Sequence, residues 1–154
     1  MIVTLKNGRQ FQIDEDDWDS VKHIKWNIHL MRKGYKYVYT FQKTDKSRKM
    51  IYLHRMLMNC KNPMFVDHIN GDTLDNRKSN LRVLTNRQNQ WNQKRVRGFV
   101  PYKGVTFENG AYRSRIRING KKKSLGRFKT AIEASNAYNQ ASLELHGSYS
   151  HIIK

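Results

Sequence analysis

Apolar and polar residues alternate with a period of two in the first part of the chain. The segments "IVTL" and "QFQI" flank Asn7-Gly8, so residues 2–13 are predicted to form a β-hairpin. Residues 14–24 follow as a predicted short helix with acidic residues in its first turn, where they complement the helix dipole. Residues 35–42 predict a strand whose aromatic side chains share one face, namely Tyr35, Tyr37, Tyr39 and Phe41. We expect that face to pack in the core; stacking on bases is the alternative.

The middle of the chain predicts strands, a polar loop and a helix. Residues 50–59 pass from a strand into a short helix that carries His54 and Arg55. "MFVDH" and "LRVLT" read as two strands separated by a long loop rich in Asn and Asp, and a helix follows. Thr85 and Gln88 stand at the reciprocal positions of a capping box at the start of that helix.

The last third of the chain reads as a separate small unit. "YKGVTF", "YRSRIRI" and "KKSLGRF" predict three strands, with an Asn-Gly pair at each of the two joints. Thr130 and Glu133 predict a capping box that opens a helix to about His146, and Gly147 is a suitable stop. One face of this helix is expected to lie on the sheet through Ala134, Ala137, Tyr138, Ala141 and Leu145.

The predicted elements give an α+β fold with four segments. We expect a β-rich N-terminal extension over residues 1–55, a strand-loop-strand-helix unit over 56–93, a basic linker over 94–101 and the sheet-and-helix unit over 102–150.

The net charge of the chain narrows the range of possible functions. The chain has 154 residues with 30 Lys and Arg against 12 Asp and Glu, a formal net charge of +18. The excess is spread over the whole length: residues 1–59 carry 12 basic against 6 acidic residues, 60–98 carry 8 against 3, and 99–154 carry 10 against 3. A polyanion contacted along much of the chain explains this distribution best, and nucleic acid is the leading candidate.

Other features exclude several classes. Cys60 is the only cysteine, which argues against a disulfide framework and a thiolate zinc site. No apolar run approaches membrane-spanning length, and the first residues lack the apolar core of a signal peptide. We therefore expect no membrane or protein partner and a cytoplasmic location, which would be the host cytoplasm for a phage gene.

The adjacent Asp67-His68 pair is the main candidate for chemistry. A neutral imidazole can take a proton from water near pH 7, and a hard divalent cation held by oxygen ligands can stabilise a scissile phosphate. Side chains alternate along a strand, so Asp67 and His68 point to opposite faces unless the strand bends. Phosphodiester cleavage needs both functions in one place.

The sequence around this pair, "VDHINGDTLDNRKSNLRVLT", resembles the HNH nucleases, particularly the phage and intron-encoded homing type. The resemblance implies a ββα-metal (His-Me finger) core of two strands, a loop and a helix around one cation. It implies that His68 is the general base, that Asp67 is the first metal ligand and that Asn80 pins the loop and keeps the histidine oriented. Asn89 matches the last motif position, where many relatives have His, and is expected to be the second ligand.

An amide oxygen at that position favours Mg²⁺ or Mn²⁺, one per active site, over zinc. Relatives also carry a His-Arg pair upstream, so His54 and Arg55 are candidate phosphate contacts. Asp72, Asp75 and Asn76 are expected to cap the backbone of the loop.

A row of arginines distinguishes the last unit. Arg113, Arg115 and Arg117 share one face of the central strand, while Ser114 and Ile116 face the other way, toward the helix. Residues 102–150 resemble the plant ethylene-response-factor (Apetala-type) DNA-binding domain, through "YKGV", "SLGRF" and "TAIEASNAYNQASLELHG". That family places its sheet in the major groove. The resemblance puts the following residues on the DNA-facing strands: Lys103, Arg113, Arg115, Arg117, Lys123 and Arg127. Thr106 stands where plant members often have Arg, so the plant target sequence does not carry over.

These features predict a site-specific endonuclease of the HNH homing type that cuts double-stranded DNA and leaves 3′-hydroxyl and 5′-phosphate ends. Two rivals remain open from the sequence. One is a DNA-binding regulator with a vestigial nuclease fold. The other is a ribonuclease or RNA-binding protein, which the groove-reading sheet disfavours because side chains reach poorly into the deep groove of A-form RNA.

Overall fold

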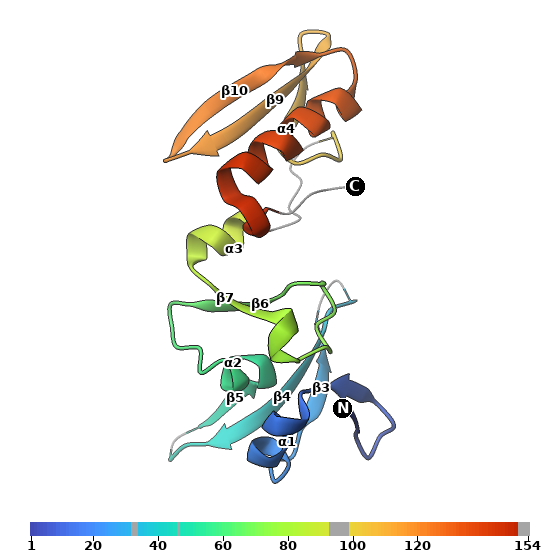
Figure 1. The fold of residues 1–154 in the computed structure, drawn as a ribbon, viewed down its shortest axis with the longest axis vertical. Coiled ribbons are helices and arrows are strands. Elements are labelled where there is room, and N and C mark those ends of the chain that lie inside the picture. The colour runs from blue at the N-terminus through green and yellow to red at the C-terminus, as the bar shows by residue number, and fades with distance from the viewer. Residues whose placement is uncertain (32–33, 46, 93–98, 151–154) are drawn as a thin grey trace. The chain divides into compact units, whose positions relative to one another are not determined.

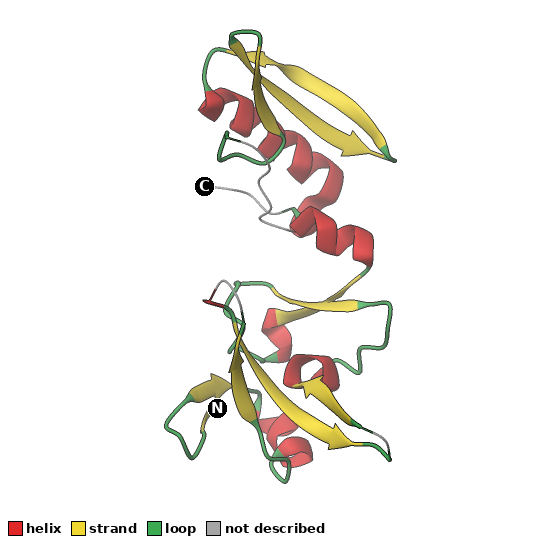
Figure 2. Cartoon of the chain, turned by 180° about the vertical axis from the view of Figure 1, so that it is seen from behind, coloured by secondary structure: helices red, strands yellow, loops and turns green. Residues whose placement is uncertain are grey.

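The structure is a computed structural model that describes residues 1–31, 34–45, 47–92 and 99–150. It divides the chain into two compact units, Met1–Asn86 and Arg87–Lys154. Each unit mixes small antiparallel sheets with helices, as Figures 1 and 2 show. None of the helices in the described ranges is long and apolar enough to cross a membrane. The boundary expected between residues 55 and 56 falls inside the first unit, and most of the expected linker lies outside the described residues.

The first unit is built from three separate antiparallel sheets. β1 pairs with β2, β4 is central in the sheet β3-β4-β5, and β6 pairs with β7. The strands are β1 (Ile2–Thr4), β2 (Gln10–Gln12), β3 (Asn27–Leu30), β4 (Lys36–Lys43), β5 (Arg48–Tyr52), β6 (Phe65–His68) and β7 (Leu81–Leu84). The helices are α1 (Glu15–Val21), α2 (Leu53–Leu57) and the short 3₁₀ helix η2 (Lys78–Asn80). The predicted hairpin, the acidic first turn of α1 and the passage from β5 into α2 are confirmed.

One apolar core joins the elements of the first unit. It gathers buried side chains from the N-terminal hairpin, α1, β3, β4 and α2, namely Val3, Phe11, Ile13, Val21, Trp26, Ile28, Val38 and Leu53. The N-terminal segment therefore shares its core with the helix that carries His54. Burial of these side chains supplies the main drive for folding of this unit.

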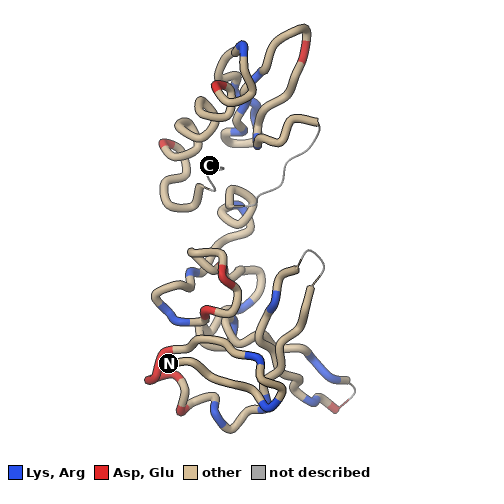
Figure 3. Tube along the Cα trace, turned by 90° about the vertical axis from the view of Figure 1, so that its right-hand side faces the viewer, with Lys and Arg blue, Asp and Glu red and all other residues tan. Residues whose placement is uncertain are grey.

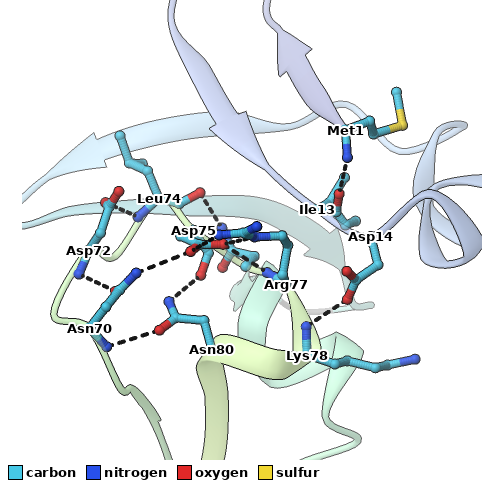
Figure 4. A network of polar contacts seen from close by, with 11 residues as sticks. Met1, Ile13, Asp14, Asn70, Asp72, Leu74, Asp75, Arg77, Lys78 and Asn80 are labelled. Atoms are coloured by element: carbon cyan, nitrogen blue, oxygen red, sulfur yellow. Dashed lines mark hydrogen bonds and ion pairs between the residues drawn. The ribbon is translucent and has the colours of Figure 1, made fainter.

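The N-terminal hairpin also holds the polar loop between β6 and β7. Gln12 donates its backbone N–H to the Leu74 carbonyl at 2.8 Å, and its own carbonyl accepts from the Asn76 N–H at 2.9 Å. The Asp14 carboxylate accepts from the backbone N–H of Lys78 at 2.7 Å (Figure 4). Because an unpaired buried backbone group is costly, these contacts fix the loop against the hairpin. The extension is thus part of the scaffold that shapes the loop.

The prediction that the aromatic face of β4 packs in the core is wrong. Val38 and Thr40 are buried on β4, whereas Tyr35 and Phe41 are 42% and 49% exposed. Val38 pairs with Ile28 across the ladder, so the β-branched residues, and not the aromatic ones, face the core. The aromatic face of the sheet therefore points away from this core.

The second unit contains a three-stranded antiparallel sheet covered by one helix. Its strands are β8 (Val105–Glu108), β9 (Ala111–Ile118) and β10 (Lys121–Phe128), in the order β10-β9-β8. Its helices are α3 (Asn86–Asn92), of which residues 87–92 lie in this unit, α4 (Ala131–His146) and the 3₁₀ helix η3 (Gly147–Tyr149). In Figure 1, α4 lies across one face of the sheet. The predicted three strands, the central position of β9 and the helix end at His146 are confirmed.

The predicted capping box at the start of α4 is present. Thr130 accepts from the Glu133 N–H at 3.2 Å, and Glu133 accepts from the Thr130 N–H at 3.1 Å. Tyr138 packs so closely on Gly104 that a Cβ there would meet its ring at 2.1 Å. The buried stripe of α4 comprises Ala134, Ser135, Tyr138 and Ser142. The expectation for Leu145 is wrong, because it is 43% exposed and the stripe instead runs through Ser142, which is 1% exposed.

Candidate active site

The β6–β7 pair places Asp67 and His68 at the end of a strand. Asp67 lies opposite Arg82 and His68 opposite Leu81, so their side chains point to different faces of the pair. His68 is the last residue of β6 and is 6% exposed. The Asp67 side chain remains 21% exposed. The imidazole is therefore held inside the unit, while the carboxylate stays within reach of solvent.

Two rings from other elements pack against the His68 imidazole, and a third ring packs behind them. His54 of α2 makes an edge contact with it, with ring centroids 5.1 Å apart and planes at 76°. Tyr37 of β4 lies 6.2 Å from His68 and 5.5 Å from His54. Tyr52, at the end of β5, stacks on His54 at 5.5 Å with planes 16° apart. The aromatic face of the β3-β4-β5 sheet thus forms a wall of the candidate site.

Both histidines are kept neutral by this enclosure. Burial is the main cause that lowers the pKa of His54 to about 3, and the neighbouring His68 and Arg55 contribute to this shift. Burial also lowers the pKa of His68, although the Asn76 side chain and the Asp67 carboxylate oppose that shift. The buried Nδ1 of His54 has no hydrogen-bond partner among the described residues. A neutral His68 can accept a proton near neutral pH.

Asn76 fixes the orientation of the His68 ring. The Asn76 amide nitrogen donates to the Leu74 carbonyl at 3.1 Å, so its Oδ1 faces His68, whose Nε2 lies 3.4 Å away. Because Oδ1 can only accept, His68 Nε2 carries the proton, and Nδ1 is the nitrogen left to accept another. Asn76 was expected to cap the loop backbone; besides its bond to Leu74, it contacts the candidate base directly.

Asn80 joins the two sides of the polar loop. Its side-chain nitrogen donates to the Asp75 carbonyl at 2.8 Å, and its Oδ1 accepts from the Asn70 N–H at 2.9 Å (Figure 4). The side chain is 7% exposed. This is the geometry that the pinning role requires, since one amide bridges backbone groups ten and five residues away. Loss of Asn80 would leave two backbone groups without partners.

Asp75 is the charged centre of this loop. Its carboxylate receives two hydrogen bonds from the Arg77 guanidinium, at 2.8 and 2.7 Å, and one from the Asn70 amide at 3.1 Å. These donors hold the pKa of Asp75 below its ordinary value, with the Arg77 side chain as the main cause. Asp72 caps the Leu74 N–H at 3.0 Å, as predicted. The carboxylate of Asp75 therefore stabilises the conformation of the polar loop.

The Asp67 carboxylate is paired with Arg82. Arg82 donates from Nε at 2.9 Å and from Nη2 at 2.8 Å, and both contacts engage Oδ2 of Asp67. The two side chains are 21% and 17% exposed, so the pair lies at the margin of the unit. An ion pair of this kind orients the carboxylate.

Arg55 braces the segment that precedes β6. Its guanidinium donates to the carbonyls of Met64 and Cys60 at 3.0 and 3.1 Å, and to the Asn62 side chain at 3.2 Å. These bonds hold the turn between α2 and β6 in place. The structure thus shows a structural task for Arg55, while a phosphate contact for it or for His54 stays a prediction.

Asn89 lies on α3 in the second unit. This helix is held there by Trp91, whose ring stacks on His146 with centroids 4.0 Å apart and planes at 9°. The role of Asn89 as a ligand remains a prediction. Among the described residues, no group of three or more His, Cys, Asp and Glu side chains is arranged to hold a metal ion. The expectation that Asp67 and Asn89 provide oxygen ligands for Mg²⁺ or Mn²⁺ rather than zinc likewise stays a prediction.

The outer face of the second sheet carries the predicted arginines. Arg113 lies opposite Thr106 and Arg127, and the opposite partners of Arg115 and Arg117 are Ser124 and Lys122. Directly opposed residues share a face, so these side chains form one basic surface, which we call the arginine face. Figure 3 shows Lys and Arg positions along this unit.

Two predicted members of that surface lie elsewhere. Lys123 pairs with Ile116, a buried residue of the opposite face, so Lys122 occupies the place expected for Lys123. The bulge between Ser124 and Gly126 could not be read from simple alternation. Lys103 precedes β8, and its Nζ donates to the Trp91 carbonyl at 2.5 Å. It is therefore not on a DNA-facing strand.

Glu108 neutralises part of the arginine face. It accepts two hydrogen bonds from Arg115, at 3.0 and 2.8 Å, and lies 3.5 Å from Arg113. The Arg115 side chain is the main cause that holds the pKa of Glu108 below its ordinary value. Sequence reasoning missed this residue, although alternation along β8 places it on the arginine face.

Other residues missed by sequence reasoning are Tyr37, Tyr52 and Asn76, which touch the two histidines. The aromatic alternation of β4 did single out Tyr37, but core packing was the preferred interpretation. Asn76 carried no signal of its own within a loop so rich in amides. These contacts depend on the tertiary arrangement of β4, β5 and the loop.

Comparison with known proteins bears on the same segment. Residues 52–91 match the model of the family described as HNH endonuclease. A protein of Acanthamoeba polyphaga mimivirus, described as an uncharacterized HNH endonuclease, is 28% identical over 136 residues, which cover 87% of this chain and 69% of that protein. No solved structure gives a significant match. Neither match names an Apetala-type domain in the second unit. The matched segment spans α2, β6, the polar loop, β7 and most of α3, so this part of the chain is similar to HNH endonucleases.

Proposed function

We propose that this protein is a site-specific endonuclease that hydrolyses phosphodiester bonds in double-stranded DNA. The observation that carries the proposal is the state of His68. It is buried, ring-packed and hydrogen-bonded to a fixed amide at the end of β6, beside Asp67, within the segment that matches HNH endonucleases. An imidazole held in this way suits a general base, and the charge of +18 suits a polyanionic substrate.

In this proposal His68 Nδ1 takes the proton from the attacking water. Asn76 keeps the other nitrogen protonated, the rings of His54 and Tyr37 shield the imidazole from solvent, and Tyr52 supports His54 from behind. Asn80 acts through the loop and holds Asn70 and Asp75 in the positions on which the His68 environment depends. Base catalysis of this type contributes about 10²–10⁴ to a rate.

The donor chemistry supports Mg²⁺ or Mn²⁺ as the cofactor, with one ion per active site. Asp67 would supply a carboxylate oxygen and Asn89 an amide oxygen. Oδ1 of Asp67 is the better candidate, because Arg82 engages Oδ2. A bound cation would stabilise charge on the scissile phosphate and on the leaving oxygen. Attack of water on phosphorus with cleavage of the P–O3′ bond would leave 3′-hydroxyl and 5′-phosphate ends.

The second unit is proposed to grip the target. The three-stranded sheet, its arginine face and the helix behind it agree with the resemblance to the Apetala-type domain, and a sheet of this kind fits the major groove. The homing-type specificity also rests on resemblance. Residues 87–154 carry 14 Lys and Arg against 3 Asp and Glu, which supports a nucleic-acid partner for this unit.

A supercoiled plasmid incubated with the protein and Mg²⁺ tests the proposal, with EDTA as the control. We expect nicked or linear DNA only with the metal ion. Intact plasmid in both samples would contradict the nuclease proposal. The same assay on structured RNA separates a ribonuclease from the proposed DNA endonuclease.

One observation favours a second candidate, a DNA-binding regulator with a vestigial HNH fold. Arg82 occupies the Asp67 carboxylate, and in a protein without catalysis that pair would serve only the fold. Retained binding to target DNA together with an intact plasmid would favour this candidate.

A further inference from the structure

The second unit contains a cavity of about 600 Å³ that the proposed catalysis does not use. Its walls come from α3, the segment before β8, the β9–β10 turn and the end of α4. The lining residues include Arg87, Trp91, Lys103, Arg117, Asn119 and His146. A cavity of this size is within the range of ligand pockets.

Specific contacts build the walls of this cavity. The Trp91 ring stacks on His146, and the Arg87 guanidinium lies 5.4 Å from the centroid of the Trp91 ring. Arg87 also donates to the Asn119 side chain at 2.7 Å. The Lys103 ammonium is held at the Trp91 carbonyl. Three elements that are distant in sequence are thus fixed around one space, with cationic groups among the lining residues.

The charges in this cavity are not balanced by the protein. Of the described residues that line it, three are cationic and none is acidic. Arg87 contacts an amide and a ring, Lys103 contacts a carbonyl, and no ion pair within the described ranges includes Arg117. Arg113 and Arg115, on the same sheet, share Glu108 instead. Unpaired cations brought together in this way favour an anion from outside the chain.

The pKa of His146 agrees with a positive local field, and that of Lys103 reports the burial of its charge. Burial lowers the pKa of the Lys103 ammonium. Burial likewise lowers the pKa of His146, and the charges of Lys103 and Arg87 lower it further. Both shifts mean that additional positive charge is unfavourable in this cavity, whereas a bound anion would relieve it.

We propose that this cavity binds a phosphodiester group of a nucleic-acid strand. Guanidinium groups match phosphate oxygens with two parallel hydrogen bonds, and Lys103 adds a compact charge. Arg117 belongs both to the arginine face and to the cavity lining, so one strand can pass from the face into the cavity. The inference rests on the proposed function, because it extends the DNA contact of the second unit beyond the arginine face.

The test uses the full chain labelled with ¹⁵N and follows the indole N–H signal of Trp91, assigned with Trp91→Phe. A short DNA duplex and pyrophosphate are titrated separately. We expect both to shift this signal in wild type and in Arg87→Lys, and neither to shift it in Arg87→Gln. Lys129→Gln is the matched control, because it removes one positive charge from an exposed site beyond the far end of β10. Arg87→Gln should also flatten the slope of log affinity against log salt by about 0.9, and Lys129→Gln should leave it unchanged.

The possible results distinguish failure of the cavity proposal from failure of the proposed function. If the duplex binds but the Trp91 signal does not move, the cavity proposal is wrong and the DNA-binding proposal survives. A shift with pyrophosphate alone would mean a site for small phosphates, and would overturn the assignment to a nucleic-acid strand. If the duplex does not bind at all, the proposed function fails, and a pyrophosphate shift would again indicate a small-phosphate site.

Discussion

Asn76 Oδ1 lies 3.4 Å from Nε2 of His68, and the Asn76 amide is held in that orientation by the Leu74 carbonyl. The candidate base is therefore oriented by a neutral amide, which fixes the tautomer without adding a charge. Protonation of Nε2 leaves Nδ1 as the reactive nitrogen.

Replacement of Asn76 tests this orientation. Asn76→Ala should slow DNA cleavage by about 10–100-fold, as is usual for a group that orients a site residue. It should also cost about 1–3 kcal/mol of unfolding free energy, because the Leu74 carbonyl loses its donor. ¹⁵N NMR of His68 separates the two effects: wild type should show the Nε2–H tautomer, and the variant a mixture. Unchanged tautomer and unchanged rate would contradict the role given to Asn76.

The metal ligands can be tested by titration. Asp67→Ala and Asn89→Ala should each raise the Mg²⁺ concentration needed for half-maximal cleavage, because each removes one oxygen ligand. Asn92→Ala is the matched control, since it removes an amide from the same helix. If Asn89→Ala titrates with Mg²⁺ like the Asn92 control, Asn89 is not a ligand.

The arginine face should become a stronger DNA-binding surface without Glu108. Glu108→Gln removes the carboxylate that engages Arg113 and Arg115, so affinity for the target duplex should rise. The salt slope should steepen by about 0.9 for each arginine that gains a phosphate. Glu144→Gln on α4 makes the same change in net charge away from this face, and its slope should stay close to that of wild type. Equal slopes for the two variants would mean that the arginine face does not meet phosphate.

Arg115 provides the test of sequence reading. If Arg115 contacts a guanine edge, Arg115→Ala should cost about 1–3 kcal/mol of binding free energy and relax the preference at one base position. Uniform weakening across target and scrambled duplexes would assign it to the phosphate backbone. Because the variant also exposes Glu108, Arg115→Ala should be measured in the Glu108→Gln background.

His54 should make the protein less stable in acid. Its pKa is about 3 in the folded chain and about 6.5 when exposed, so only the unfolded chain binds this proton between those values. The stabilising contribution is complete above pH 6.5 and falls as pH decreases toward 3, by at most about 1.4 kcal/mol per pH unit. Urea unfolding at pH 7, 6, 5 and 4 should show a shallower loss for His54→Phe. Parallel curves for the two proteins would mean that His54 is not held neutral by burial.

Local patterns predicted most of the elements. Asn-Gly turns, alternation and capping residues placed the N-terminal hairpin, the three strands of the second unit and α4. The side of β4 that faces the core could not be predicted, because alternation offers two faces and Val38 meets Ile28 only in the folded sheet. The bulge in β10 moved Lys123 off the arginine face for the same reason: ladder register is a tertiary property.

Some residues of the candidate site were predicted from the sequence, and others were not. Asp67, His68 and Asn80 stood out because a carboxylate, an imidazole and an amide occur at motif spacing. The rings of Tyr37 and His54 meet His68, and Tyr52 stacks on His54, from separate strands and a helix, so no local pattern could bring them together. The packing of α3 in the second unit was also unexpected, since residues 56–93 were expected to form one unit. A chain shortened to residue 98 would lose His146, the stacking partner of Trp91 on the helix that carries Asn89.

The central claim, that His68 is the base of a DNA endonuclease, is tested most directly by single-turnover cleavage with His68→Ala. Wild type and variant are compared on the same target duplex at saturating protein and fixed Mg²⁺, with DNA affinity measured in parallel. We predict unchanged affinity and a cleavage rate lower by about 10²–10⁴. Cleavage by His68→Ala at the wild-type rate, abolished by EDTA in both proteins, would contradict the account.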